Sequence, residues 1–140
     1  MRILCIDLGD KRTGMAISDE LGITAQGIET YTRSGDEEQD IVYITRRANE
    51  LGAGTILFGM PRNMNGTYGP QAEKVRAFAG VLQELWQGKV EYFDERMTTM
   101  VAERVLISAD VSRKKRRQVV DKLAAVVILQ GYLDTKANTR

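Results

Sequence analysis

The stretch ILCIDLGDKRTG, from Ile3 to Gly14, decides the fold because it combines a buried strand with a turn. Residues 2–8 are dense in Ile, Leu and Cys, which is typical of a strand covered on both faces. Asp7 stands inside this run, and an ionised carboxylate is costly to bury without a partner. Gly9 follows closely, so we expect Asp7 at the carboxyl end of the strand, where ligand sites commonly form.

Two interpretations of Asp7 remain open at this point. Side chains alternate along a strand, so Asp7 shares a face with Cys5, and Leu8 lies on the other. The carboxylate could bind a cation at the strand end. Alternatively, it accepts hydrogen bonds from turn amides or pairs with Lys11 or Arg12.

Outward from this stretch, the pattern predicts a meander of three strands and then alternating helices and strands. The predicted strands span residues 2–8, 13–18, 23–32 with a break at Gly27, 55–60 and 90–93. The predicted helices span residues 36–51, 70–88, 98–109 and 112–134. This order predicts an α/β protein with a five-stranded mixed sheet, three strands antiparallel and two parallel, and helices on both faces. We expect one domain over residues 1–134 and a flexible tail over 135–140.

Composition excludes several kinds of chemistry. Histidine is absent from the 140 residues, which excludes Ser-His-Asp and Cys-His catalysis and His-ligated zinc. Cys5 is the single cysteine, so no internal disulfide can form, and a reducing cytoplasmic location is expected. We see no signal peptide and no apolar window long enough to span a membrane, so no membrane partner is expected. Catalysis would have to use carboxylates, lysines, tyrosines or a metal.

A second acidic position lies in VEYFDERMTT, residues 90–99, where a predicted strand ends before a helix cap. Asp94 and Glu95 point to opposite faces of a strand, so only one of them can readily point at a site above its end. The alternative is a solvated loop in which either acid pairs with Arg96.

A third carboxylate, Asp121, lies in the final predicted helix. Ala124 and Ala125 follow it on the same face and would let the helix approach a sheet closely. The alternative is a surface ion pair with Arg117 at i, i+4 spacing. Taken together, the three acidic positions predict a site for one or two Mg²⁺ or Mn²⁺ ions, which prefer oxygen ligands. Two such ions can clamp the attacking water and the leaving oxygen of a phosphodiester during hydrolysis.

Basic residues suggest an anionic partner, although the net charge is only +1. The run SRKKRR opens the last predicted helix, where adjacent cations oppose the helix dipole and repel one another. Binding of phosphate there would reverse both effects. The alternatives are a solvated charged surface for this run and an ordinary connector for the loop PRNMNGTYGP, residues 61–70. The candidate nucleic-acid-binding residues are Lys11, Arg12, Arg62, Asn63, Asn65, Arg96, Arg113, Lys114, Lys115, Arg116 and Arg117.

Four ordered blocks together resemble the YqgF family, also called RuvX. These blocks are DLGDKRTGMAISD (7–19), FGMPRNMNGTYGP (58–70), DERMTT (94–99) and VSRKKRRQVVDKLAAVVILQGYLD (111–134). The resemblance implies a ribonuclease H-like fold, similar to that of the RuvC Holliday-junction resolvase. It also implies that Asp7, Glu95 and Asp121 are the catalytic residues and hold Mg²⁺ or Mn²⁺, with Asp94 leaving some ambiguity at the second position.

The same resemblance implies a hydrolase that acts on the 5′ end of pre-16S rRNA during ribosome biogenesis, or a resolvase of branched DNA. Structured RNA is the favoured partner, and the protein is expected to be a monomer or a homodimer. A nucleic-acid-binding factor with a vestigial site is a further alternative. An actin-like or sugar-kinase-like phosphate handler is the least favoured, because the chain has a single Asp-x-Gly block where those proteins resemble two such domains.

Overall fold

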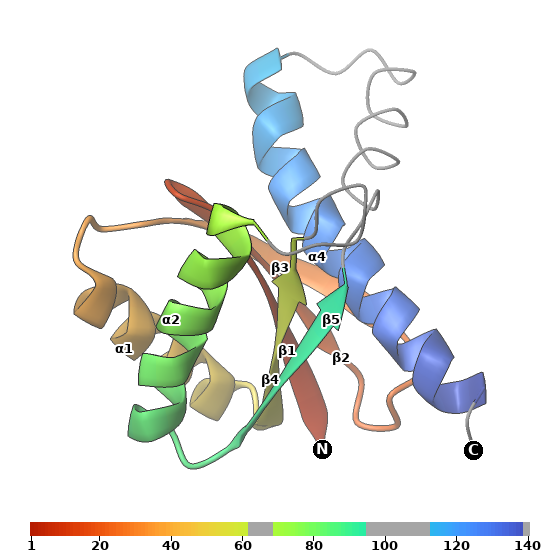
Figure 1. Ribbon diagram of the computed structural model, residues 1–140. Coiled ribbons are helices and arrows are strands. Elements are labelled where there is room, and N and C mark those ends of the chain that lie inside the picture. Colours follow the sequence, from red (N-terminus) through yellow and green to blue (C-terminus); the bar gives the residue numbers. More distant parts are fainter. Residues whose placement is uncertain (62–68, 95–112, 139–140) are drawn as a thin grey trace.

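The computed structural model describes residues 1–61, 69–94 and 113–138, with the side chains of the last segment described from 123 to 136 (Figure 1). Its elements, in chain order, are β1 (Arg2–Leu8), β2 (Arg12–Ser18), β3 (Ala25–Thr32), α1 (Glu37–Glu50), β4 (Ala53–Met60), α2 (Pro70–Leu85), β5 (Lys89–Asp94) and α4 (Arg113–Asn138). All five predicted strands are confirmed, with small shifts at their ends. The helix predicted over 98–109 lies outside the described residues.

The five strands form one sheet in the order β3-β2-β1-β4-β5, with β1 at its centre. β1 pairs antiparallel with β2 and parallel with β4. The outer pairs continue these two patterns, since β2 and β3 are antiparallel and β4 and β5 are parallel. The mixed sheet predicted from the sequence is therefore confirmed. Its parallel strands β1, β4 and β5 all end at the same edge, the upper edge in Figure 1.

Helices cover both faces of this sheet, with α1 and α2 on one side and α4 on the other (Figure 1). Alternate residues of β1 enter two separate cores, as the strand period requires. Leu4, Ile6 and Leu8 join the larger core with residues of α1 and α2. Cys5 joins the smaller core with Leu57 and with residues of α4. Asp7 has the same parity as Cys5, so its side chain is on the α4 face.

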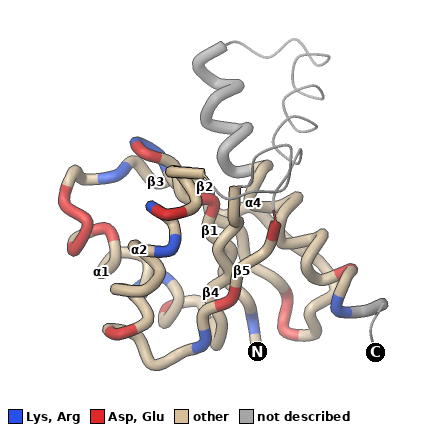
Figure 2. Tube along the Cα trace, viewed as in Figure 1, with Lys and Arg blue, Asp and Glu red and all other residues tan. Residues whose placement is uncertain are grey.

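Local chemistry explains where α1 begins and ends. The Asp36 side chain accepts a hydrogen bond from the Glu38 amide at 3.0 Å, which satisfies one of the free N–H groups of the first turn. Acidic residues fill that turn and suit the helix dipole (red at the start of α1 in Figure 2). After the helix, Gly52 takes the left-handed conformation with φ of 71°, which costs glycine little.

The predicted break in the third strand is a β-bulge. Met15 pairs with Glu29 and the next residue, Ala16, pairs with Gly27, so Ile28 is an extra residue on β3. A bulge of this kind increases the local twist of the edge strand.

The predicted end of the last helix is wrong. We expected it near Asp134, but α4 continues to Asn138. No proline or glycine interrupts residues 132–138, and the Thr135 hydroxyl donates to the carbonyl of Gly131 at 2.9 Å. Lys136 lies over the Tyr132 ring at 5.4 Å and suits the negative end of the helix dipole. None of the described helices is both long and apolar enough to cross a membrane.

Thr13 is a fully buried polar residue of β2 whose hydroxyl has no hydrogen-bond partner among the described residues. An unpaired buried hydroxyl costs roughly 1–3 kcal/mol. We expect Thr13→Val, which keeps the β-branched shape, to raise the free energy of unfolding by about 1 kcal/mol. Urea denaturation followed by circular dichroism measures the change.

Ser18→Ala is the control for this prediction, because the buried Ser18 hydroxyl is fully used. It accepts from the Ile3 amide at 2.8 Å and donates to the Asp19 carbonyl at 3.0 Å. The control should therefore lose stability. A loss of stability in Thr13→Val as well would show that the Thr13 hydroxyl has a partner in solution.

Candidate active site

Asp7 occupies the position predicted for it. It is the next-to-last residue of β1, the central strand, and its side chain is partly buried. It belongs to the face covered by α4, at the sheet edge where β1, β4 and β5 end. This edge is where open α/β sheets place their ligands.

Glycines flank Asp7 on both neighbouring strands. Gly14 of β2 is its direct register partner. On the other side, Ile6 pairs with Phe58, so Gly59 is the next residue of β4 beside Asp7. Because a glycine has no side chain, neither of these two positions projects a side chain beside the Asp7 carboxylate. A ligand or the backbone of another chain can approach the carboxylate there.

The register of β5 separates Asp94 from Asp7. Gly59 pairs with Phe93, and Phe93 packs edge-on against Tyr132 of α4, with ring centroids 6.0 Å apart. Phe93 is therefore on the α4 face, and Asp94, one residue further, is on the opposite face. Glu95 lies outside the described residues. Of the two adjacent acids, Asp94 thus fails the geometric requirement for joining Asp7 on the α4 face.

Small residues of helix α4 pack against the sheet on the face that carries Asp7. Ala125 is completely buried in one cluster with Cys5 of β1 and Ala16 of β2, so the helix backbone lies close to the sheet. Asp121 is one helical turn before Ala125, on the backbone of α4. The Asp121 side chain lies outside the described part of the helix, so its predicted role is untested.

Of the predicted nucleic-acid-binding residues, Lys11 and Arg12 have described side chains. Lys11 is exposed in the turn between β1 and β2, and Arg12 begins β2. Residues 113–117 form the first turns of α4, but their side chains lie outside the described part. Arg62, Asn63, Asn65 and Arg96 also fall outside the described residues. Among the side chains that are described, no three acids or cysteines come together as a metal-binding group.

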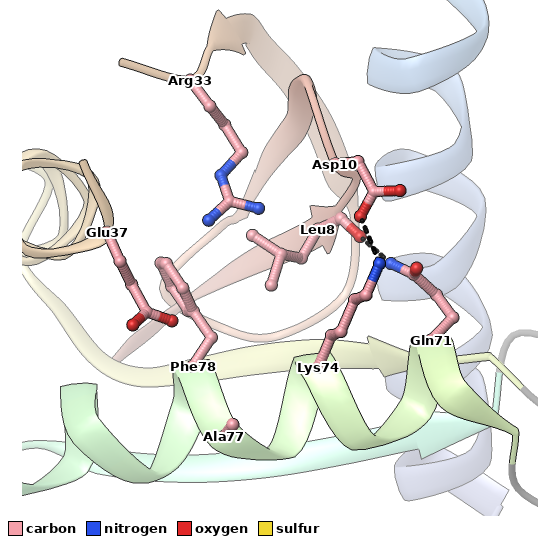
Figure 3. A pocket seen from close by; sticks show the side chains of 8 residues that line it. All are labelled: Leu8, Asp10, Arg33, Glu37, Gln71, Lys74, Ala77 and Phe78. Atoms are coloured by element: carbon pink, nitrogen blue, oxygen red, sulfur yellow. Dashed lines mark hydrogen bonds and ion pairs between the residues drawn. The ribbon is translucent and has the colours of Figure 1, made fainter. Parts of the chain in front are cut away.

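The sequence did not indicate a hollow of about 210 Å³ on the α1 and α2 face (Figure 3). It lies on the opposite side of β1 from the Asp7 carboxylate. Four charged side chains line it: Arg33, Lys74, Asp10 and Glu37. Because the two positive and two negative charges cancel, the hollow has no net attraction for an anion. One of its lining residues, Arg33, connects the β1–β2 turn to α1.

Solved structures define the fold class of this site. T. thermophilus RuvC in complex with a Holliday junction substrate matches with a TM-score of 0.61 at 12% identity, over 99% of this chain and 97% of that one. Another Thermus thermophilus RuvC structure matches with a TM-score of 0.54 at 11% identity, over 99% of this chain and 98% of that one. The protein therefore has the ribonuclease H-like fold of RuvC.

Sequence relatives identify the family. A family model described as "RuvX: Holliday junction resolvase" matches residues 1–135. A protein of Pelotomaculum thermopropionicum named "Putative pre-16S rRNA nuclease" is 51% identical over 140 residues, covering 100% of this chain and 91% of that protein. A protein of Bacillus cytotoxicus with the same name is 55% identical over 139 residues, covering 97% of this chain and 100% of that protein. The chain belongs to the RuvX family.

Proposed function

We propose that this protein is a metal-dependent nuclease that hydrolyses phosphodiester bonds during 5′-end processing of pre-16S rRNA in the cytoplasm. One observation carries the proposal. Asp7 lies at the carboxyl end of the central strand, between two glycines, on the face that α4 covers. The name of these relatives supports the choice of RNA, and the RuvC fold supports phosphodiester chemistry.

We assign Asp7, Glu95 and Asp121 as the catalytic acids. Asp94 is on the opposite face from Asp7, which leaves Glu95 as the acid of that segment with the same parity as Phe93. Asp121 precedes Ala125 by one turn, and Ala125 packs on the strand that carries Asp7. These relations support one shared site for the three carboxylates.

Three carboxylates without histidine or thiolate form a hard oxygen donor set, which fits one or two Mg²⁺ or Mn²⁺ ions. A bound ion would lower the pKa of a coordinated water and neutralise charge on the phosphate. Because Gly14 and Gly59 have no side chains, there is room beside Asp7 for the phosphate of the substrate. The protein itself holds the three carboxylates in place and excludes other arrangements of them around an ion.

Cations on both sides of this site would hold the nucleic-acid backbone. Lys11 projects from the turn that follows β1, and Arg12 begins β2. The basic run 113–117 opens α4, at the positive end of its dipole. Contacts to phosphate and sugar carry no sequence information directly. We therefore propose that the protein recognises the shape of a structured RNA.

A matched substrate panel tests the proposal. Purified protein with Mg²⁺ is incubated with an RNA that carries the 5′ precursor segment of 16S rRNA and with a four-way DNA junction. We expect cleavage of the RNA with a kcat/KM at least about tenfold above that for DNA, a difference of ~1.4 kcal/mol. Binding without cleavage of either substrate would support a non-catalytic factor instead.

Holliday-junction resolution is the second candidate, because the matching family model and the RuvC complex both name this substrate. A four-way junction has two-fold symmetry, so a resolvase is expected to act as a dimer. Paired, symmetric cuts in the DNA junction by a dimer, with no cut in the RNA, would establish this candidate.

A further inference from the structure

We infer that the buried carboxylate of Asp40 is a positioning residue for the turn Gly9–Arg12, and that it holds this turn in the conformation that presents Lys11 and Arg12 to nucleic acid. The part of the inference that concerns nucleic acid rests on the proposed function. The part that concerns the turn stands on hydrogen bonds alone.

Asp40 is an unusual residue of α1, because it is 1% exposed although aspartate is almost never fully buried without partners. Its Oδ1 accepts from the Tyr31 hydroxyl at 2.9 Å and from the amide and hydroxyl of Ser34 at 3.0 and 2.9 Å. Its Oδ2 accepts from Arg33 Nε at 3.0 Å. Burial alone would raise the pKa of Asp40, but these donors hold the pKa below its ordinary value. The carboxylate is therefore a fixed anion at neutral pH.

Arg33 transmits this fixed position to the turn. While Nε is held by Asp40, Nη1 donates to the Gly9 carbonyl at 3.0 Å. The backbone amide of Arg33 donates to the Lys11 carbonyl at 2.8 Å. The guanidinium also lies over the Phe78 ring of α2 at 5.3 Å, and Figure 3 shows it pointing into the hollow between the turn and that ring. Two carbonyls of the turn are thus held by one arginine.

The turn also has constraints of its own. The Gly9 amide donates to the Arg12 carbonyl at 2.9 Å, which closes the hairpin. Gly9 is required for this closure, because an added Cβ would lie 2.4 Å from the Arg12 carbonyl oxygen. The ion pair of Lys74 with Asp10, at 3.4 Å, is exposed and contributes little. The Asp40–Arg33 pair differs from this exposed ion pair because its carboxylate is buried.

The direction of these contacts suits a positioning role. Arg33, which Asp40 fixes, donates to backbone carbonyls of the turn, and neither residue pairs with the Lys11 ammonium among the described interactions. Lys11 is exposed, and the turn starts two residues after Asp7. A turn held in one conformation loses less entropy when its cations bind a phosphate backbone.

Asp40→Asn tests the inference. The carboxamide has one NH₂ group, which must face a donor in either orientation, because both carboxylate oxygens accept hydrogen bonds. We expect Arg33 to release the Gly9 carbonyl. Amide hydrogen exchange at Gly9 and Arg33 should then accelerate at least about tenfold, whereas exchange at Gly22, in the β2–β3 turn, should not change. Binding of the precursor rRNA fragment, or of the four-way junction, should weaken about five- to tenfold.

Glu29→Gln is a matched control, because Glu29 also joins β3 to α1 through a tyrosine and an arginine. It accepts from the Tyr43 hydroxyl at 2.6 Å and from Arg47 Nε at 2.9 Å. The two networks are adjacent, since the rings of Tyr31 and Tyr43 stack at 4.1 Å. The Glu29 network makes no contact with the Gly9–Arg12 turn among the described interactions. We expect this control to lose stability without accelerating exchange at Gly9 or weakening binding.

Arg33→Lys covers the case in which Asp40→Asn does not fold. Lysine keeps the positive charge beside Asp40 but lacks the two-armed group that reaches both Asp40 and Gly9. The same acceleration at Gly9 is expected. Unchanged exchange at Gly9 in folded Asp40→Asn or Arg33→Lys, or equal acceleration in Glu29→Gln, would overturn the inference. So would accelerated exchange with unchanged binding. If the wild-type protein binds neither probe, the proposed function fails, and exchange at Gly9 alone decides whether Asp40 positions the turn.

Discussion

Asp7→Asn should reduce Mg²⁺-dependent cleavage at least about a thousand-fold, which corresponds to ~4 kcal/mol of transition-state stabilisation. An amide oxygen keeps the shape of the side chain but lacks the charge that attracts a divalent cation. Asp7 lies at the strand end on the α4 face, away from the larger core. The free energy of unfolding should therefore change by less than about 1 kcal/mol. Single-turnover cleavage of the precursor rRNA fragment measures the loss.

Asp94→Asn is the matched control for Asp7→Asn. Asp94 also ends a parallel strand at the same sheet edge, but its side chain is on the opposite face. Its replacement should reduce cleavage less than about fivefold, because no contact with the scissile phosphate is expected. Cleavage by Asp7→Asn at the wild-type rate, in protein free of contaminating nuclease, would contradict the assignment.

Asp7→Asn also distinguishes a nuclease from a non-catalytic binding factor in cells. A nuclease requires Asp7 for mature 16S rRNA 5′ ends. A binding factor would tolerate Asp7→Asn and would instead depend on the basic run, which the double variant Lys114→Glu, Arg116→Glu removes. Primer extension on cellular rRNA from both strains distinguishes these cases.

Ala125→Leu should lower stability by roughly 1–3 kcal/mol through overpacking and should also reduce cleavage about a hundredfold. Ala125 of α4 is fully buried in one cluster with the small residues Cys5 and Ala16 of the sheet, so a larger side chain must push the helix away from the sheet. We propose that Asp121 moves with the helix, and a displacement of about 1 Å in a catalytic group can cost a hundredfold in rate. Thermal unfolding and single-turnover cleavage measure the two effects.

Ala79→Leu makes the corresponding change on the other face. Ala79 of α2 is also fully buried, but it packs in the larger core, away from α4. We expect a similar loss of stability with less than about a tenfold loss of cleavage below the melting temperature. Equal losses of cleavage in the two variants would show that activity follows overall stability and does not depend on the placement of α4.

Much of the fold followed from local patterns. The apolar run over residues 2–8 gave a strand covered on both faces, and alternation along it correctly assigned Cys5 and Leu8 to different cores. The helices predicted to begin at residues 36 and 70 begin at Glu37 and Pro70. These features depend on residues close in sequence, which is why a single sequence is sufficient for them.

The remaining features depend on contacts between distant segments. Asp40 was not distinguished from the other acids of α1, because its burial depends on packing against the β3–α1 connection. The sequence alone did not decide which of the adjacent acids Asp94 and Glu95 shares a face with Asp7. That follows from the register, which places Phe93 beside Gly59. The roles of Glu95 and Asp121 remain predictions, since neither side chain is described.

We propose that Asp7, Glu95 and Asp121 share a divalent ion, and anomalous diffraction from crystals soaked in Mn²⁺ would locate that ion. We expect an anomalous peak about 2 Å from a carboxylate oxygen of each residue, at the end of β1 between Gly14 and Gly59. The peak should be absent in crystals of Asp7→Asn. Manganese peaks elsewhere, with none in contact with Asp7 of the wild-type protein, would show that the three acids do not share an ion.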